Sequence, residues 1–359
     1  MSKKKKVTAL DVARAAGVSQ ATVSMVLNNS DYASFSEETR QKVYQACIAT
    51  GYRSIAPAKA KGNLKTILTA CPSCGNADYM AEVESIQKAC LNHGYNSLTL
   101  FTLRNPEIEK NILQTVSAQA IDGVIFLYKP ENPWIISNIE SLVPTISVCD
   151  HDPLIVFDSI EINSEKIGAI IAQHLIDFGH ERIAYIATEL NKKHSLRVNR
   201  LNGIKNTYHS NGYDPEESIV VCTFETEGLL LGDSTTDYEA GFILANQVIE
   251  KYNVTAIVGN NDQVCFGIID AIQRKKKRIP QDYSVCGCDN ITLSNIKSLS
   301  LTTIDNYTNL RATEAVNLLI RKIKNLSKSA KEQSPISTVK VEYTPKLVLR
   351  SSTGPARKI

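Results

Sequence analysis

Residues 7–28 of the chain read VTALDVARAAGVSQATVSMVLN. This stretch predicts two short helices joined by a turn at Gly17. Thr8 and Ser19 each precede a helix, where a hydroxyl accepts hydrogen bonds from first-turn N–H groups, and a pair of valines flanks each cap. The apolar residues of the second helix fall on one face. Its other face carries Gln20, Ala21, Ser24 and Met25.

A third helix is expected from a cap at Ser36 to a stop at Gly51. Three helices of this kind form a small bundle, in which the second helix can present its free face to base edges in a major groove. The spacing alone also fits a plain helical hairpin with no such role. We therefore predict a helix-turn-helix headpiece at residues 1–51. The distribution of charge along the chain distinguishes a DNA-binding headpiece from a plain hairpin.

Charge is divided unevenly along the chain. Residues 1–65 hold eleven Lys and Arg against four Asp and Glu, a net charge of +7, whereas residues 66–359 hold 29 against 33, a net charge of −4. A basic segment that contains a helix-turn-helix pattern is typical of phosphate binding. Lys3–Lys6 fits an arm that adds attraction to DNA without reading sequence. The charge therefore favours DNA binding over a plain hairpin.

These residues resemble the lactose-repressor and purine-repressor family of bacterial transcription regulators. The resemblance continues through most of the chain, for example in Asp177–Ile183, Ile279–Asp282 and Leu347–Thr353. It implies that Gln20, Ala21 and Met25 read bases. It implies phosphate contacts from Ser19, Thr22 and Ser24. Thr8 and, in the hinge, Lys59 are further expected DNA contacts.

From about residue 64 onward, short apolar runs alternate with amphipathic segments, which is typical of parallel strands joined by helices. Helix stops are expected at Gly94, Gly179 and Gly212. The resemblance implies two α/β lobes with parallel sheets, like those of periplasmic binding proteins, and a ligand cleft between them. We expect a hinge at 52–63, a core at 64–350 and a tail at 351–359. The expected strands are 65–71, 96–101, 123–127, 145–149, 182–187, 218–222, 255–259 and 284–287.

Ligands bind in such sheets just beyond the carboxyl ends of strands. Polar residues at these positions suit sugar hydroxyls or the edge of a nucleobase, and the resemblance supports them as effector contacts. A lone Asp or Asn after a strand is also a common helix cap, and Asp262 is expected to be one. The candidate effector residues are Asn76, Tyr79, Asp150, Arg200, Asn261 and Asp289.

Two features depart from the family pattern. Thr236 stands where many sugar-binding members place an aromatic ring, with Tyr238, Phe224 or Trp134 as possible substitutes. The hinge lacks the leucine that wedges into the minor groove; Pro57 fits only the first turn of a helix, and Ile55 is the only bulky alternative. The effector class and the bending of DNA are thus left open.

Alternative functions have weaker support. Cys71-Pro-Ser-Cys74 has the C-x-x-C spacing of thiol oxidoreductases, and Cys149 and Cys288 also end strands, which leaves a thiol- or metal-sensing regulator as the alternative. No histidine with ligand spacing accompanies them, so no metal or cofactor is expected. Nine scattered cysteines indicate reduced thiols, and the absence of a secretion signal points to the cytoplasm. The DNA-binding headpiece excludes a transporter's solute-binding protein.

The sequence thus predicts a non-enzymatic transcription regulator, most consistent with a repressor. One recognition helix covers too few base pairs for useful specificity, so a homodimer on a near-palindromic operator is expected. The chain ends about ten residues after Leu349 without a leucine heptad, so no tetramerisation helix is predicted. The expected effector is a sugar, a sugar phosphate or a nucleoside-like compound.

Overall fold

The computed structural model describes residues 7–27, 35–50, 52, 65–118, 120–130, 133–152, 157–191, 195–224, 236–326 and 337–358. The chain divides into two compact units, residues 1–64 and 65–359. Among the described residues, no helix combines the length and the apolar character needed to cross a membrane.

The first unit contains three helices, α1 (Ala9–Ala16), α2 (Gln20–Leu27) and α3 (Glu37–Thr50). Its core is formed mainly by buried valines, including Val12, Val23, Val26 and Val43. Gly17 adopts the left-handed conformation, with φ of 66°, and so turns the chain between α1 and α2. The predicted three-helix headpiece is confirmed.

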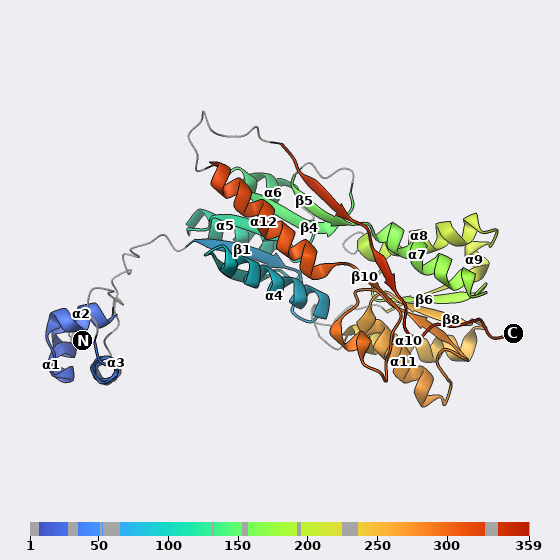
Figure 1. Ribbon diagram of the computed structural model, residues 1–359, viewed down its shortest axis with the longest axis horizontal. Helices are drawn as coiled ribbons and strands as arrows, with labels where there is room; N and C mark the ends of the chain where they lie inside the picture. The colour runs from blue at the N-terminus through green and yellow to red at the C-terminus, as the bar shows by residue number, and fades with distance from the viewer. Residues whose placement is uncertain are drawn as a thin grey trace. The chain divides into compact units, whose positions relative to one another are not determined.

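The second unit begins with a six-stranded parallel sheet in the order β11-β5-β4-β3-β1-β2 (Figure 1). Helices α4 (Ala77–Asn92) and α12 (Thr308–Leu326) cover one face of this sheet, and α5 (Pro106–Ala118) and α6 (Pro133–Glu140) cover the other. We call this layered body the first lobe. Its strands are β1 (Thr66–Cys71), β2 (Asn96–Phe101), β3 (Gly123–Phe126), β4 (Thr145–Asp150), β5 (Ser159–Ile162) and β11 (Lys340–Tyr343).

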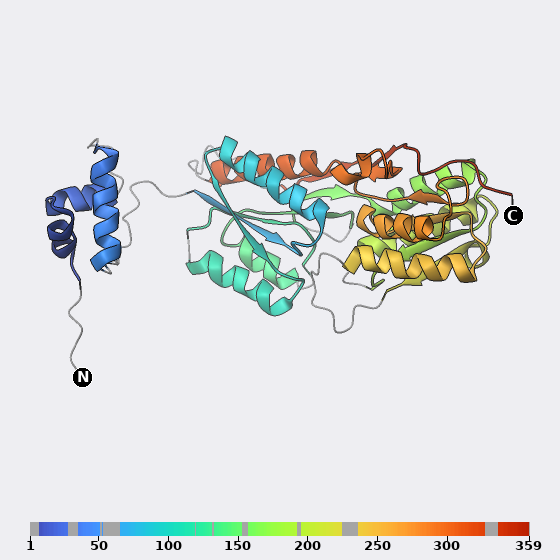
Figure 2. The same cartoon turned by 90° about the horizontal axis from the view of Figure 1, so that it is seen from below.

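The second lobe is a four-stranded parallel sheet in the order β7-β6-β8-β9, again between helices (Figure 2). Helices α7 (Ser164–Asp177) and α8 (Ser195–Ser210) pack on one face, and α10 (Thr236–Lys251) and α11 (Asp262–Arg274) pack on the other. Its strands are β6 (Ile183–Ala187), β7 (Ile219–Thr223), β8 (Ala256–Gly259) and β9 (Ser284–Cys286). The short helix α9 (Pro215–Ser218) precedes β7, and the short helix η2 (Thr292–Asn295) follows β9.

A third, two-stranded antiparallel sheet joins β10 (Thr303–Asp305) to β12 (Lys346–Val348). The residues after it pack onto the second lobe: Ser352 Oγ donates to the carbonyl of Val285 at 2.6 Å, and the N–H of Ala356 donates to the carbonyl of Phe178 at 2.8 Å. This part of the chain therefore fastens onto β9 and the end of α7.

The eight expected strands are all present, with ends that differ by a residue or two. The three expected glycine stops are confirmed, with φ of 74° at Gly94, 81° at Gly179 and 88° at Gly212. Four strands, β5, β10, β11 and β12, are not predicted from the sequence. Each has only three or four residues. Runs this short carry little periodic signal, and each of these four contains a charged residue that interrupts the apolar run, unlike the equally short β3, β8 and β9.

Two glycine pairs bring helices unusually close in the second lobe. A Cβ atom placed on Gly168 of α7 would lie 2.0 Å from the carbonyl oxygen of Arg200, and one on Gly203 of α8 would lie 2.0 Å from that of Glu165. The second pair, Gly241 and Gly267, allows the same approach between α10 and α11. The α7–α8 contact fixes the helix that carries Arg200.

Candidate functional site

The outer face of α2 is the first candidate site. Gln20, Ala21 and Ser24 are exposed and Met25 is half-buried, while Val23 and Val26 face the headpiece core. The exposed and the buried residues alternate with the period expected of a helix that buries one face. The side chains expected to meet bases therefore lie on a continuous, accessible helix face.

Caps hold the first turns of α1 and α2. The N–H of Thr8 donates to the Asp11 carboxylate at 2.9 Å, and the N–H of Thr22 donates to Ser19 Oγ at 3.0 Å. The hydroxyls of Ser19 and Thr22 also lie 2.9 Å apart. The predicted phosphate contacts at Ser19 and Thr22 thus sit at the positive end of α2, where N–H groups point outward and favour an anion. Lys59 lies outside the described residues, as do the other hinge positions 53–63.

In the body, the candidate residues follow the carboxyl ends of strands in both lobes. Asp150 ends β4 and is buried. Its carboxylate accepts the N–H of Ser164 at 2.8 Å and the side-chain amide of Asn199 at 2.8 Å. Burial raises the pKa of Asp150, although both hydrogen bonds favour its charged form. Asp150 thus joins the first sheet to α7 and α8 of the second lobe.

Arg200 projects from α8 and is only 5% exposed. One guanidinium nitrogen donates to the carbonyl of Asn260 at the end of β8. Its Nε has no hydrogen-bond partner among the described residues. A buried guanidinium N–H without a partner costs free energy, because its hydration is lost and nothing replaces it. Arg200 therefore has a donor that an oxygen of a bound molecule could satisfy.

Asn261 caps α11, since its side-chain oxygen accepts the N–H of Val264 at 2.9 Å, and its amide donates to Asp237 at 2.8 Å. The prediction that Asp262 is the cap is wrong. Asp262 is fully buried and accepts from Ser294 Oγ and Thr303 Oγ1, both at 2.5 Å, and from the N–H of Ile291 at 3.1 Å. Burial raises its pKa to about 7. Its contacts come from residues about 30 and 40 positions later, so local spacing could not reveal them.

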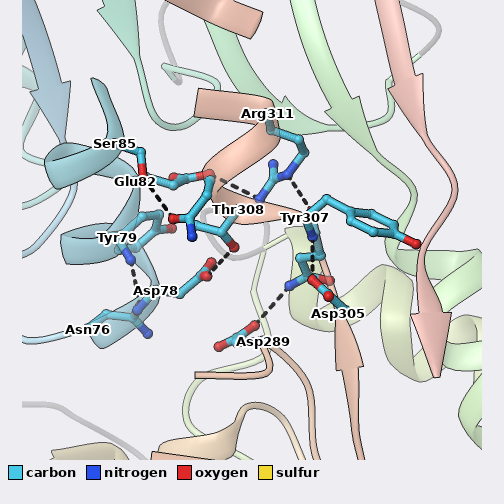
Figure 3. A network of polar contacts seen from close by, with 12 residues as sticks. Asn76, Asp78, Tyr79, Glu82, Ser85, Asp289, Asp305, Tyr307, Thr308 and Arg311 are labelled. Atoms are coloured by element: carbon cyan, nitrogen blue, oxygen red, sulfur yellow. Dashed lines mark hydrogen bonds and ion pairs between the residues drawn. The ribbon is translucent and has the colours of Figure 1, made fainter. Parts of the chain in front are cut away.

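Asp289, after β9, has φ of 118°, a backbone conformation that a residue other than glycine rarely adopts. Its carboxylate accepts the side-chain amide of Asn306 at 3.0 Å (Figure 3). Burial and the nearby carboxylate of Asp78 raise the pKa of Asp289 well above its ordinary value, against the attraction of Arg200. The strained backbone holds this carboxyl group close to Arg200 and Asp78.

Asn76 caps α4, because its side-chain oxygen accepts the N–H groups of Asp78 at 2.9 Å and Tyr79 at 3.1 Å. Tyr79 lies in the first turn of α4, and its hydroxyl accepts a hydrogen bond from Arg104 at 3.2 Å. Both residues are half-buried. These two candidate effector residues thus lie at the ordered start of a helix.

A polar network between α4 and α12 of the first lobe contains residues that sequence reasoning did not single out (Figure 3). Arg311 of α12 pairs with Glu82 of α4 at 3.0 Å, and both side chains are at least 95% buried. Thr308 Oγ1 donates to Asp78 at 2.5 Å. Burial raises the pKa of Glu82 to about 8, against the pull of the Arg311 guanidinium. A charged residue on the apolar side of a helix, as at Glu82, was the only available signal.

Gln263 also bridges the lobes. Its side-chain oxygen accepts the N–H of Ala77 at 3.0 Å, and its amide donates to the carbonyl of Gly75 at 3.3 Å. Gln263 lies on α11 of the second lobe, whereas Gly75 and Ala77 lie at the start of α4. These bonds hold one arrangement of the lobes at the strand ends.

The candidates thus fall into two groups. Asp150, Arg200 and Asp289 lie close enough to influence one another's charge, together with Asp78. Asn261 contacts Asp237, and Tyr79 contacts Arg104; Arg197 lies near both Asp237 and Tyr79. Tyr238 is one of the side chains considered in place of the aromatic ring missing at Thr236. Its hydroxyl donates to Asp270 at 2.5 Å, and Asp270 lies more than two helical turns along α11 from Asn261.

Two of the candidate thiols, Cys71 and Cys149, are buried, and all nine cysteines are free. Burial raises the pKa of each of these two thiols to about 12. The thiolate is the nucleophile and the metal ligand, so these groups are poorly suited to either role at neutral pH. The thiol oxidoreductase and thiol-sensor alternatives are not supported.

Comparison with known proteins identifies both units. Residues 8–54 match the family model described as bacterial regulatory proteins, lacI family, and residues 172–353 match a periplasmic binding protein-like domain. The chain is 32% identical over 356 residues to the HTH-type transcriptional repressor PurR of Histophilus somni, covering 96% of this chain and 98% of that one. It is 28% identical to the HTH-type transcriptional regulator DegA of Bacillus subtilis, covering 98% and 99%.

The fold agrees with these matches. A lac repressor solved with bound ONPG superposes with a TM-score of 0.66 and 25% identity, covering 97% of this chain and all of that one. The matched relatives are regulators and repressors rather than enzymes. The chain belongs to the lacI family of bacterial regulatory proteins and is a DNA-binding transcriptional repressor.

Proposed function

We propose that this repressor binds a near-palindromic operator as a homodimer in the cytoplasm and is controlled by a small polar effector. The effector is a sugar, a sugar phosphate or a nucleoside-like compound. It binds between the lobes at the strand ends, where Arg200, Asp150 and Asp289 supply donors and acceptors from separate elements. Asn76, Tyr79 and Asn261 complete the site from the starts of α4 and α11.

The observation that carries this proposal is the buried Arg200. Its side chain is 95% buried, its Nε is without a partner among the described residues, and acidic groups surround it. Buried polar groups normally have partners, and the exceptions call for a functional explanation. A ligand with hydroxyl or heteroatom acceptors would meet this donor, while Asp150 and Asp289 would accept from its hydroxyl or N–H groups. A lac repressor of similar fold was solved with ONPG bound, which supports a small-molecule effector here.

The face of α2 supports the DNA-binding part. Met25 and Ala21 can contact a thymine methyl group but cannot make the paired hydrogen bonds that select guanine. Gln20 is the exposed side chain of this face that can make paired hydrogen bonds to adenine. We therefore assign most hydrogen-bonded specificity to Gln20 and an A·T-tolerant contact to Met25.

Exposed apolar side chains support the homodimer. Leu91, at the end of α4, is 61% exposed, and Leu98 and Phe101 are exposed on β2, an edge strand of the first sheet. In the second lobe, Leu293 is 50% and Ile296 45% exposed. Contacts between two chains would cover exposed apolar side chains of this kind. Analytical ultracentrifugation would contradict this assignment if it found a monomer at micromolar concentration.

The effector is tested in two steps. A thermal-shift screen of sugars, sugar phosphates, nucleosides and nucleobases identifies the compound, and an operator titration by fluorescence anisotropy measures its effect. Operator and effector must alter each other's affinity by the same factor, which is typically worth ~1–3 kcal/mol. The neutral variant Asp289→Asn and the truncation Arg200→Ala should bind operator normally but lose this response.

Arg274→Ala is the matched control, because Arg274 lies on the exposed side of α11 and pairs with Asp270. Each variant is first checked for a cooperative unfolding transition. An effector response that persists in both Asp289→Asn and Arg200→Ala would remove these strand ends from the mechanism.

A further inference from the structure

A cluster outside the proposed effector site joins His151 to two glutamates. The imidazole Nδ1 of His151 lies 2.7 Å from Glu161 Oε2 and 3.3 Å from Glu342 Oε2. His151 directly follows β4, Glu161 lies in β5 and Glu342 lies in β11, so three neighbouring parallel strands contribute one group each. We propose that these three side chains form a binding site for a divalent transition-metal ion.

The register of the sheet supplies the first argument. Glu161 and Glu342 are direct partners on adjacent parallel strands. Like charges in directly opposite positions destabilise a sheet. The Glu161 side chain is only 2% exposed, so water screens this repulsion poorly. A cation between the two carboxylates removes the repulsion.

The hydrogen bonds around the cluster supply the second argument. Ser159 Oγ donates to Glu161 Oε1 at 2.5 Å, and Lys166 Nζ lies 2.6 Å from Glu342 Oε1. Each carboxylate is therefore held through one oxygen, while its other oxygen faces the imidazole. The backbone N–H of His151 donates to the carbonyl of Ile162 at 2.7 Å, which fixes the start of the loop that carries the ring. The three ligand atoms lie within 4.8 Å of one another.

The donor set indicates the class of ion. One imidazole nitrogen and two carboxylate oxygens suit Zn²⁺, Mn²⁺ or Co²⁺ better than Mg²⁺ or Ca²⁺, which prefer oxygen donors alone. Three protein ligands leave a coordination position for water. The ion would replace whatever proton His151 Nδ1 carries between the carboxylates. The hydrogen bond from Ser159 would then orient the Glu161 carboxylate, whereas Lys166 competes with the ion for Glu342.

The position of the cluster links it to the lobes. β5 runs directly into α7, and β11 is followed by β12, so Glu161 and Glu342 lie on segments that lead from the first lobe to the second (Figure 1). The neighbour of His151 is Asp150, which accepts the N–H of Ser164 at the start of α7. A bound ion would stiffen this connection beside the proposed effector site.

The test is a titration of the full-length, chelator-treated protein with Co²⁺, followed by visible absorption. We expect one saturable site per chain with ligand-field bands and no thiolate charge-transfer band. Loss of an outer partner of a metal ligand costs about 10–100-fold in affinity, so loss of a ligand should cost at least about tenfold. His151→Ala and Glu342→Gln should each show this loss.

A gain of affinity separates the site from mere damage to the fold. Lys166→Gln removes a competing cation from Glu342, so it should tighten Co²⁺ binding severalfold. His93→Ala is the matched control, because His93 is an exposed histidine that contacts Asn317. Cys74→Ser removes the exposed thiol. Neither control should alter binding.

Three results would overturn the proposal. The first is the absence of saturable Co²⁺ binding. The second is binding by Glu342→Gln that equals the unmodified protein, since this half-exposed residue can change without loss of the fold. The third is a thiolate charge-transfer band that disappears in Cys74→Ser, which would place the ion on a cysteine. In any of these cases, His151 serves only as a hydrogen-bonding partner of the two glutamates.

Discussion

The headpiece and the body present their polar side chains in opposite ways. On α2, Gln20, Ala21 and Ser24 are exposed on one short helix, and the caps that hold it come from residues three positions apart. In the body, Asp150, Arg200 and Asp289 come from distant strands and helices, are largely buried, and are held by residues up to 60 positions away. DNA readout therefore rests on local structure, whereas effector binding depends on how whole layers pack.

The largest expected effect comes from separating the two regions. A chain that begins at Leu64 should remain folded, because residues 65–359 form a compact unit with their own cores. It should lose operator binding altogether, because the helix-turn-helix and the excess positive charge lie in residues 1–65. Gel-shift assays at moderate salt measure this directly. A shifted operator band with the shortened chain would show that the body also binds DNA.

A packing change should damage the body while leaving the headpiece intact. Gly168→Ala would place a Cβ atom 2.0 Å from the carbonyl oxygen of Arg200 and so force α7 and α8 apart. Overpacking of this kind costs about 1–3 kcal/mol and sometimes more. Urea unfolding measures the loss, and effector binding should weaken because Arg200 moves with α8.

Ser210→Ala serves as the control for this substitution. Ser210 is exposed at the end of α8, the helix that carries Arg200, and its hydroxyl donates to the carbonyl of Asn206 one turn earlier, so this substitution should change stability by no more than ~0.5 kcal/mol. Equal stability of Gly168→Ala and the unmodified chain would mean that the close crossing does not position Arg200.

This difference also explains what could be predicted from sequence. Thr8, Ser19, Gly17 and the valine stripe act over one or two helical turns, so the headpiece follows from local patterns. Apolar runs and glycine stops likewise predict the eight main strands, and hence the strand-end positions of Asp150, Asn261 and Asp289. Strand order and partner choice involve residues far apart, which local patterns do not encode.

Asp262 illustrates that limit. Its position after a strand and before a helix predicts a cap, yet Asn261 takes that role and Asp262 turns inward to Ser294 and Thr303. The pairing of Glu161 with Glu342 escapes notice for the same reason, since β5 and β11 are four residues long and about 180 positions apart. Both are products of tertiary packing rather than of local spacing.

A smaller and more specific effect is expected in the headpiece. Gln20→Ala should cost about 1–3 kcal/mol of discrimination at one base pair of each half-site, with little change at the others. Global stability should hardly change, because Gln20 is exposed. Binding to a set of operators with single substitutions measures the pattern. Uniform weakening across all of them would make Gln20 a phosphate contact instead.

The smallest effect is a pH dependence confined to the body. The first 64 residues contain no histidine, whereas His180 is buried in the second lobe, where its ring bonds to Thr255 Oγ1 at 2.8 Å and to the carbonyl of Gly354 at 3.0 Å. Burial lowers the pKa of His180 to about 4, from an ordinary value of 6.5. The folded state therefore favours the neutral ring, and the stability that this ring provides is present above pH 6.5 and is lost as the pH falls towards 4. Buried carboxylates such as Glu82, whose pKa is raised, have the opposite dependence, so the total stability of the body does not isolate His180.

The comparison of His180→Asn with the unmodified chain cancels that contribution. His180→Asn should be destabilised at pH 7.5, and this difference in the free energy of unfolding should shrink by about 1–2 kcal/mol at pH 5. Urea unfolding at the two pH values provides the measurement, with His93→Ala as an exposed control. A difference that stays constant with pH would mean that His180 contributes only through packing.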